Sequence, residues 1–171
     1  MVTRGTLSRE EILAILGDVK DPEVPVLSVV ELGIVRDVEV GERGGGVTVV
    51  ITPTYSGCPA MSAIEEDIRA QLAAHGIAPV ELRTVYAPAW TTDWLSEEAK
   101  RKLEEYGIAP PSRAEHDLVV SLTRRPAPEH PRCPYCGSAD TGIRSEFGST
   151  ACKAICYCNG CREAFEFFKP I

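Results

Sequence analysis

Two Cys-x-x-Cys pairs near the end of the chain have the residue types and spacing of a metal site. Cys133-Pro-Tyr-Cys136 and Cys158-Asn-Gly-Cys161 are separated by 21 residues. Each pair can turn two thiolates toward one ion while the residues between the pairs form strands, as in a zinc ribbon. A segment this short cannot hold its fold by apolar burial alone, so the ion is expected to supply much of its folding free energy. The sequence therefore predicts one zinc ion with four ligands: Cys133, Cys136, Cys158 and Cys161.

Two other uses of these thiols stay open at this point. The pairs could be redox-active dithiols, and four thiolates also bind iron, as a single ion or a cluster. Two further cysteines, Cys152 and Cys156, lie between the pairs. We take the outer pairs as the ligands, because Gly137 and Gly160 are expected to form their tight turns, and we keep Cys152 as a secondary candidate. Three aromatic residues are expected to cover the site: Phe165, Phe167 and Phe168.

Cys58 is the only cysteine outside this segment, and it lies where a strand is expected to end and a helix to begin. Pro59 suits the first turn of a helix. The free amides and the positive dipole end of that helix would favour a thiolate, and the mostly polar or small residues before Cys58 would leave it accessible. A reactive or metal-holding thiol is therefore one interpretation. The other is a small buried apolar residue, the usual role of a free cysteine.

The elements that must position Cys58 follow from the hydrophobic pattern. Ser8 and Glu11 fit a capping box at the start of a helix. Asp21-Pro-Glu-Val-Pro25 cannot continue that helix, because prolines remove donors and restrict the residues before them. Alternating apolar and polar residues indicate strands, and a glycine-rich run between two of them indicates a hairpin. The expected elements are a helix over 8–18, strands over 34–40 and 47–52, a helix over 59–75, a strand over 80–86 and a helix over 96–106.

This order of elements favours an α+β fold in which helices pack on a small mixed sheet. A proline-containing segment follows, and a further short strand is expected over 117–122. We place the boundary between the two parts after this strand. The expected organisation is an α+β domain over 1–124, a linker over 125–131 and a small zinc-ribbon β domain over 132–171.

The composition limits the classes of partner. With 171 residues and 44% hydrophobic content, the chain is long enough for a domain with a core and a small appendage. The net charge of −7 comes from residues 1–125, which carry 13 basic and 20 acidic side chains, whereas residues 126–171 carry five of each. Neither part has the basic stripe that nucleic acid requires, so we expect protein partners. No apolar run approaches the ~20 residues of a membrane span and no signal peptide is evident, so we expect a cytoplasmic protein.

The first part of the chain resembles a known domain. Asp21-Pro-Glu-Val-Pro25, Leu32-Gly-Ile-Val35 and Thr52-Pro-Thr-Tyr-Ser-Gly-Cys58-Pro59 are similar to motifs of the small α+β domain of iron-sulfur cluster assembly factors such as SufT. The resemblance covers roughly the first hundred residues. It implies that Cys58 is the motif cysteine of that domain.

The tail resembles a second family. Cys133-Pro-Tyr-Cys-Gly137, Phe147-Gly-Ser-Thr-Ala-Cys-Lys-Ala154 and Cys161-Arg-Glu-Ala-Phe165 are similar to segments of the PaaD family, also called PaaJ. These proteins are accessory subunits of the phenylacetyl-CoA oxygenase (epoxidase) system. Within that pattern Cys152 belongs to the Phe-Gly-Ser-Thr segment, whereas Cys156 departs from it, which disfavours Cys156 as a ligand.

The two resemblances together imply an accessory or maturation subunit in aerobic phenylacetate catabolism. Such a subunit would assist assembly of iron or iron-sulfur centres in the oxygenase or reductase components, with Cys58 holding iron or a cluster transiently. Asp21 and Glu23 belong to the acidic loop and would lend oxygen ligands, and Cys152 is a further candidate for transfer. For both carboxylates the alternative is a helix cap and a solvated turn.

Two functions of other classes compete with this one. The chain could be a structural scaffold whose only metal is the zinc of the tail, or it could be a thiol oxidoreductase. No catalytic activity of its own is expected in the first two cases. Whether the chain associates with itself, and which component it binds, are left open by the sequence.

Overall fold

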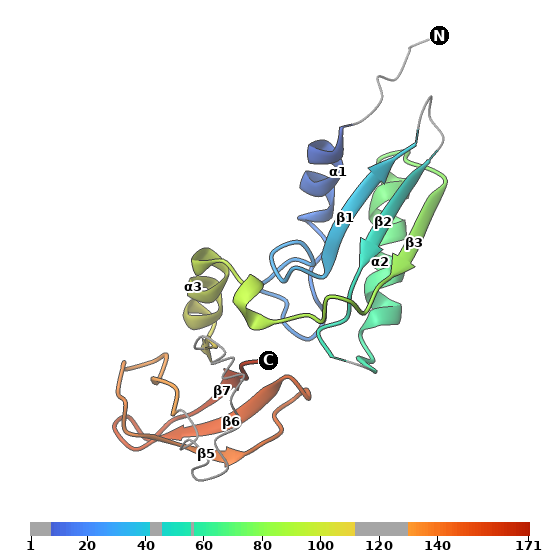
Figure 1. Cartoon of the computed structure of the whole chain (residues 1–171). Coiled ribbons are helices and arrows are strands. Elements are labelled where there is room, and N and C mark those ends of the chain that lie inside the picture. The colour runs from blue at the N-terminus through green and yellow to red at the C-terminus, as the bar shows by residue number, and fades with distance from the viewer. Residues whose placement is uncertain (1–7, 42–45, 56, 112–129) are drawn as a thin grey trace. The chain divides into compact units, whose positions relative to one another are not determined.

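The computed structural model describes residues 8–41, 46–55, 57–111 and 130–171 (Figure 1). Contacts within the chain divide it into two compact units, Met1–Trp90 and Thr91–Ile171. Within the described ranges, no helix is long and apolar enough to cross a membrane.

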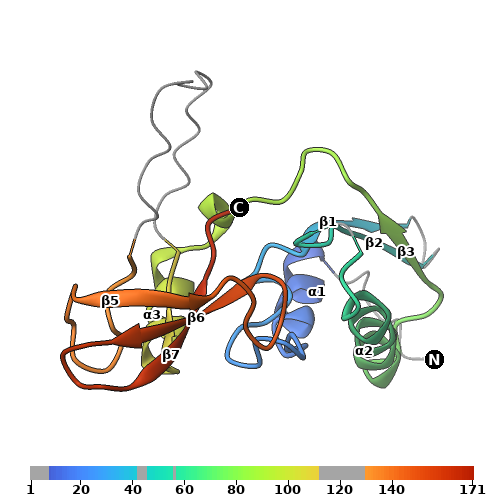
Figure 2. The same cartoon turned by 90° about the horizontal axis from the view of Figure 1, so that it is seen from below.

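The first unit is a three-stranded mixed sheet with two helices. Its elements are α1 (Arg9–Leu16), β1 (Val35–Val40), β2 (Val47–Ile51), α2 (Met61–Ala74) and β3 (Val80–Thr84). The strand order is β1-β2-β3, with β1 antiparallel and β3 parallel to β2, so α2 is the crossover between β2 and β3. Figure 2 shows both helices on the same side of the sheet. The expected α+β fold is confirmed.

Local sequence explains why these elements form. The predicted capping box is present at α1: Ser8 Oγ accepts from the Glu11 N–H at 3.2 Å, and the Ser8 N–H donates to Glu11 Oε2 at 2.7 Å. The apolar positions of both helices recur at helical spacing and meet the inner face of the sheet. Trp90 is also in this core, where its Nε1–H donates to the Leu32 carbonyl at 2.8 Å. The most deeply buried side chains of the core include Ile12, Leu16, Ile51, Ile64, Ile68 and Leu72.

The second unit is a four-stranded sheet preceded by a helix. Its elements are a 3-10 turn η2 (Thr92–Trp94), α3 (Glu97–Glu105), β4 (Ile108–Ala109), β5 (Thr141–Ser145), β6 (Lys153–Cys158) and β7 (Ala164–Phe168). The strand order is β4-β7-β6-β5. The pairs β5–β6 and β6–β7 are antiparallel, whereas β4 runs parallel to β7.

This division differs from the one expected, because α3 and β4 lie in the second unit. The two residues of β4 pair with β7, and the Ile171 carbonyl accepts from the Thr91 hydroxyl at 2.8 Å and the Thr92 N–H at 3.1 Å. These bonds attach residues 91–109 to the ribbon strands. The strand expected over 117–122 and most of the linker expected over 125–131 lie outside the described residues, so that boundary stays a prediction.

Gly107 joins α3 to β4 at a position that requires glycine. Its φ is +90°, and a Cβ there would lie 2.8 Å from Tyr135 Oη. Tyr135 belongs to the first Cys-x-x-Cys pair, so the end of α3 packs directly against that segment.

Gly107→Ala is expected to lower the free energy of unfolding by about 1 to 2 kcal/mol, because the left-handed φ strains any residue with a Cβ and Tyr135 must move. The measurement is chemical denaturation of the metal-loaded chain. Gly142→Ala is the matched control, since a Cβ at Gly142 has nothing within 4 Å. Equal effects of the two substitutions on the free energy of unfolding would contradict the requirement for glycine at position 107.

Candidate metal and thiol sites

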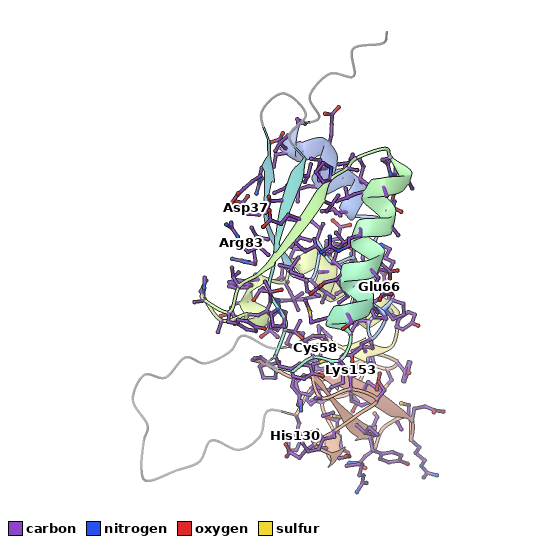
Figure 3. All side chains as sticks on the ribbon, turned by 90° about the vertical axis from the view of Figure 1, so that its right-hand side faces the viewer. Asp37, Cys58, Glu66, Arg83, His130 and Lys153 are labelled. Carbon is purple, nitrogen blue, oxygen red and sulfur yellow. The ribbon has the colours of Figure 1, made fainter. Side chains whose placement is uncertain are left out.

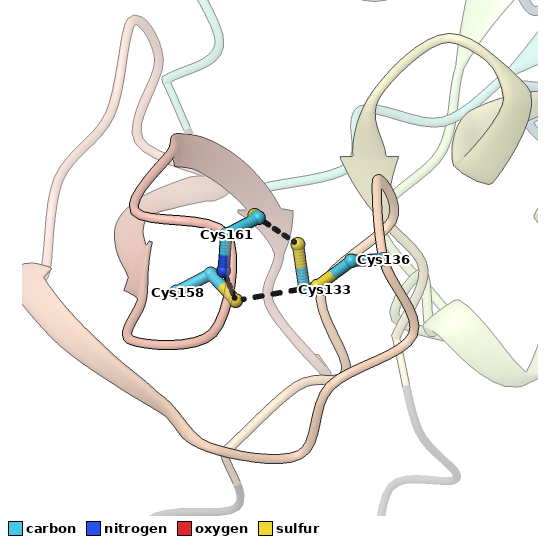
Figure 4. A group of neighbouring side chains, drawn as sticks. All are labelled: Cys133, Cys136, Cys158 and Cys161. Atoms are coloured by element: carbon cyan, nitrogen blue, oxygen red, sulfur yellow. Dashed lines mark hydrogen bonds between the residues drawn. The ribbon is translucent and has the colours of Figure 1, made fainter.

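The four predicted ligands converge in the second unit (Figure 4). The Sγ atoms of Cys133, Cys136, Cys158 and Cys161 all lie within 4.8 Å of one another. The Sγ–Sγ distance is 3.7 Å between Cys133 and Cys161 and 3.5 Å between Cys136 and Cys158. A zinc ion with Zn–S bonds of about 2.3 Å requires tetrahedral edges of about 3.8 Å between sulfur atoms. The four thiols therefore fit a tetrahedral ion without a change of fold.

Backbone turns hold both pairs in place. In the first turn the Gly137 N–H donates to the Cys133 carbonyl at 2.8 Å, and Gly137 has a φ of +70°. In the second turn, between β6 and β7, the left-handed residue is Arg162, with a φ of 64°, rather than the expected Gly160. Gly160 instead allows the two turns to lie close together, because a Cβ at this position would lie 3.2 Å from Ser138 Oγ.

The backbone also sets the proton affinity of the sulfurs. The Cys161 N–H approaches Cys158 Sγ at 3.5 Å and, as the main cause, lowers the pKa of Cys158 to about 6. The Glu163 N–H acts in the same sense on Cys161, but burial and the neighbouring sulfurs outweigh it and raise the pKa of Cys161 to about 12. Without an ion the group therefore keeps protons that a metal must displace, as is usual for thiolate sites.

The site is built into the apolar core of this unit. Cys133 and Cys158 are fully buried in a cluster with Phe165 and Phe167. Two of the three aromatic residues expected to cover the site therefore do so. Phe168 is also buried but lies outside this cluster, since neighbouring residues of a strand point to opposite faces.

The remaining two cysteines of the tail are not brought to the four sulfurs. Cys156 is buried, and burial raises its pKa to about 11, which suits an apolar packing role. Cys152 Sγ lies 3.1 Å from Thr150 Oγ1. Among the residues that the structure describes, only the four outer cysteines form a convergent group of three or more potential ligands.

Cys58 lies in the first unit, in the turn before α2 (Figure 3). The helix expected over roughly 59–75 is present, and it begins at Met61 with Ala60 as its N-cap. The Met61 N–H bonds to the Cys58 carbonyl at 3.4 Å, so Cys58 is one turn away from the helix. Its side chain is partly buried and faces a cavity of about 140 Å³. The lining residues are Pro53, Gly57, Cys58, Met61, Glu65, Thr84 and Tyr86.

The charge around Cys58 is opposite to the expected one. Burial is the main cause that raises the pKa of the Cys58 thiol, and the Ala60 N–H offsets this only in part. The carboxylates of Glu23 and Asp21 raise the pKa further. The expectation of a thiolate stabilised by the helix start is therefore wrong, since the helix begins later and the neighbouring charges are negative. The same negative charges favour a cation beside the sulfur.

The acidic loop that supplies these charges is itself ordered. Asp21 is 5% exposed, and its Oδ1 accepts from the N–H groups of Glu23 and Val24, each at 2.8 Å. The alternative role for Asp21, in which its carboxylate caps backbone N–H groups, is therefore correct for one of its two oxygens. Within the described part of the chain, Asp21, Glu23 and Cys58 do not close into a convergent ligand set, so a ligand role for either carboxylate stays a prediction.

Sequence reasoning missed Glu65. Its side chain lines the same cavity as Cys58. Glu65 follows Met61 by four residues, and side chains at this spacing share one face of a helix. That spacing is the sequence signal that could have identified Glu65 as a neighbour of the residues around Cys58.

The order of the two units and their sites defines a class of protein: an iron-sulfur cluster assembly domain followed by a zinc ribbon. Residues 9–82 match the family described as iron-sulfur cluster assembly protein, and residues 119–169 match the PaaD zinc beta ribbon domain. A protein of Escherichia coli K12 that is named as one of the subunits of 1,2-phenylacetyl-CoA epoxidase is 46% identical over 161 residues, which cover 94% of this chain and 92% of that protein. The chain belongs to the PaaD family of phenylacetyl-CoA epoxidase subunits.

Two further relatives cover the first part. A protein of Porphyromonas gingivalis named as an Fe-S protein maturation auxiliary factor is 39% identical over 97 residues, covering 56% of this chain and 90% of that protein. The crystal structure of a domain of unknown function, DUF59, from Bacillus anthracis aligns with a TM-score of 0.52 at 29% identity, covering 56% of this chain and 90% of that one. Both resemblances expected from the motifs are confirmed.

Removing one thiol should empty the four-cysteine site. Cys136→Ser is expected to reduce bound metal from about one ion per chain to a small fraction, because its exposed side chain can be changed without disturbing the core. The measurement is elemental analysis after washing with a chelator. Cys156→Ala is the control, since it removes a buried thiol outside the four and should keep the ion. A Cys136→Ser protein that retains a full ion would refute this ligand set.

Proposed function

We propose that this protein is an accessory subunit of a phenylacetyl-CoA epoxidase system that assists assembly of iron or iron-sulfur centres in the oxygenase or reductase components. Cys58 is the residue that holds the cargo during transfer. The observation that carries the proposal is a partly buried thiol at a cavity, with the charges of Asp21 and Glu23 beside it, inside a domain of the iron-sulfur assembly family. The family relationship to an epoxidase component supplies the client.

The ion of the second unit is zinc in this proposal, and its role is structural. Four thiolates fill a tetrahedral site and leave no open position for a substrate. The ion fixes the two turns and, through Tyr135 and Gly107, the end of α3. It takes no part in transfer.

The chemistry of Cys58 suits a transient ligand. A thiol with a raised pKa is protonated at neutral pH, so an incoming iron species must displace the proton. The negative charges of the acidic loop favour the arriving cation, while the proton competes with it. Binding of this kind is reversible, and reversibility is what handing the cargo to a client requires.

The same features weigh against a thiol oxidoreductase. Disulfide exchange requires an accessible thiolate and a second thiol that resolves the mixed disulfide. Cys58 has a raised pKa and is the only cysteine before Cys133 in the sequence. A structural scaffold remains the alternative, supported by the closed four-cysteine site.

Cys58→Ser tests the transfer role. Co-produced oxygenase is expected to contain several-fold less iron with this variant than with the wild-type chain, because serine is a poor ligand for iron. The variant should keep its zinc and its fold. Met61→Ala is the matched control, since it changes the same cavity without removing a ligand.

Anaerobic reconstitution separates the transfer role from the scaffold. Iron and sulfide should give visible absorption with the wild-type chain and much less with Cys58→Ser. Absence of absorption in both, together with full iron occupancy of the oxygenase, would establish the scaffold instead.

A further inference from the structure

A carboxylate lies on the wall of the cavity beside Cys58 and has no structural role there. Glu65 lines the same cavity of about 140 Å³ as Cys58. Its side chain is partly buried, and among the described residues no hydrogen bond or ion pair holds its carboxylate. Partial burial of a charge without a partner is unfavourable, so the Glu65 carboxylate would gain from a cation in the cavity.

The backbone fixes where Cys58 and Glu65 meet the cavity. Cys58 lies in a turn in which its N–H donates to the Tyr55 carbonyl at 3.3 Å and its own carbonyl accepts from the Met61 N–H at 3.4 Å. Glu65 lies one turn into α2, next to Ile64, whose side chain is fully buried in the core. Side chains four residues apart share a helix face, so Met61 and Glu65 form one wall together.

The end of β3 supplies another wall and brings the cavity to the surface. Thr84, which pairs with Ile51 of β2, and Tyr86 both line the cavity. The Tyr86 side chain is 68% exposed. A partner protein can therefore reach the cavity at Tyr86, which a site that hands on its cargo requires.

The acidic loop contributes to this site in a different way from Glu65. Asp21 Oδ1 is already used by the N–H groups of Glu23 and Val24, each at 2.8 Å. The charges of Glu23 and Asp21 act on the Cys58 sulfur, but of the described residues that line the cavity only Glu65 has a carboxylate. Metal–oxygen and metal–sulfur bonds are only about 2.1 and 2.3 Å long, so an oxygen ligand must come from the wall of the cavity that holds the sulfur.

We propose that Glu65 binds, through its carboxylate, the same iron that Cys58 binds through its sulfur. When ferrous iron arrives, the ion gives up water, the thiol gives its proton to solvent, and the iron keeps its oxidation state. Iron takes about four to six ligands, so two protein ligands leave positions at which a client can bind before Cys58 lets go. The inference rests on the proposed function, in which Cys58 holds the cargo.

Glu65→Gln tests the ligand. Ferrous iron is titrated anaerobically into the zinc-loaded chain, in which the four-cysteine site is already filled. The affinity for iron is expected to fall at least about tenfold, because glutamine keeps the size of the side chain but is a weaker ligand. Glu66→Gln is the matched control, since Glu66 is the next residue of α2, is exposed, and loses the same charge (Figure 3). Equal affinities of the two variants overturn the inference.

Glu65→His separates a ligand from a charge. A neutral imidazole binds iron but has no negative charge. If Glu65 contacts the ion, the histidine variant should bind iron clearly more tightly than Glu65→Gln does. A histidine variant that binds as weakly as Glu65→Gln shows that only the charge matters, and it contradicts the inference. Thermal unfolding should be the same for both variants as for the wild-type chain, because the Glu65 carboxylate holds no partner among the described residues.

The same titration keeps this inference separate from the proposed function. Loss of iron binding with Cys58→Ser but not with Glu65→Gln removes the role of Glu65 and leaves the proposed function intact. A wild-type chain that binds no ferrous iron overturns the role of Glu65. In that case the iron content of co-produced oxygenase, with and without Cys58→Ser, still decides whether the chain assists assembly.

Discussion

The second unit depends on the convergence of four sulfur atoms. Its apolar cluster is small, and two of its seven buried members, Cys133 and Cys158, belong to the convergent four-cysteine group. The strands of its sheet come from distant parts of the sequence, since β4 lies over 50 residues before its partner β7. Local bonds cannot hold such an arrangement together. An ion that links the two turns would supply the long-range contact that apolar burial provides in a larger domain.

The surroundings of Cys158 and Cys58 favour opposite protonation states of the same type of side chain. At Cys158, backbone N–H groups face the sulfur and favour its negative form, which suits a permanent metal ligand. At Cys58, burial and the charges of Glu23 and Asp21 favour the protonated thiol. A metal bound there would compete with a proton. The first environment therefore suits retention of an ion, and the second suits its release.

Local sequence patterns predict much of the fold and of the four-cysteine group. The capping box at Ser8, the hairpin and the convergence of the four cysteines each depend on residues close in sequence, and all are present. Pro59 predicts too early a start for α2, because a proline fits the turn before a helix as well as its first turn. β4 gave no local signal, because its two residues are too few to show a period and its partner strand β7 is distant in sequence. The family resemblance implied that Asp21 and Glu23 lie near Cys58, but the effect of their charge on the pKa of the thiol was missed.

In the proposed function, a thiol that holds its cargo weakly has a physical advantage. The raised pKa of Cys58 would weaken its hold on an iron species, because a proton competes for the sulfur. A tighter site would capture iron better but release it more slowly. Under the proposed function, the raised pKa of Cys58 would therefore favour delivery over storage.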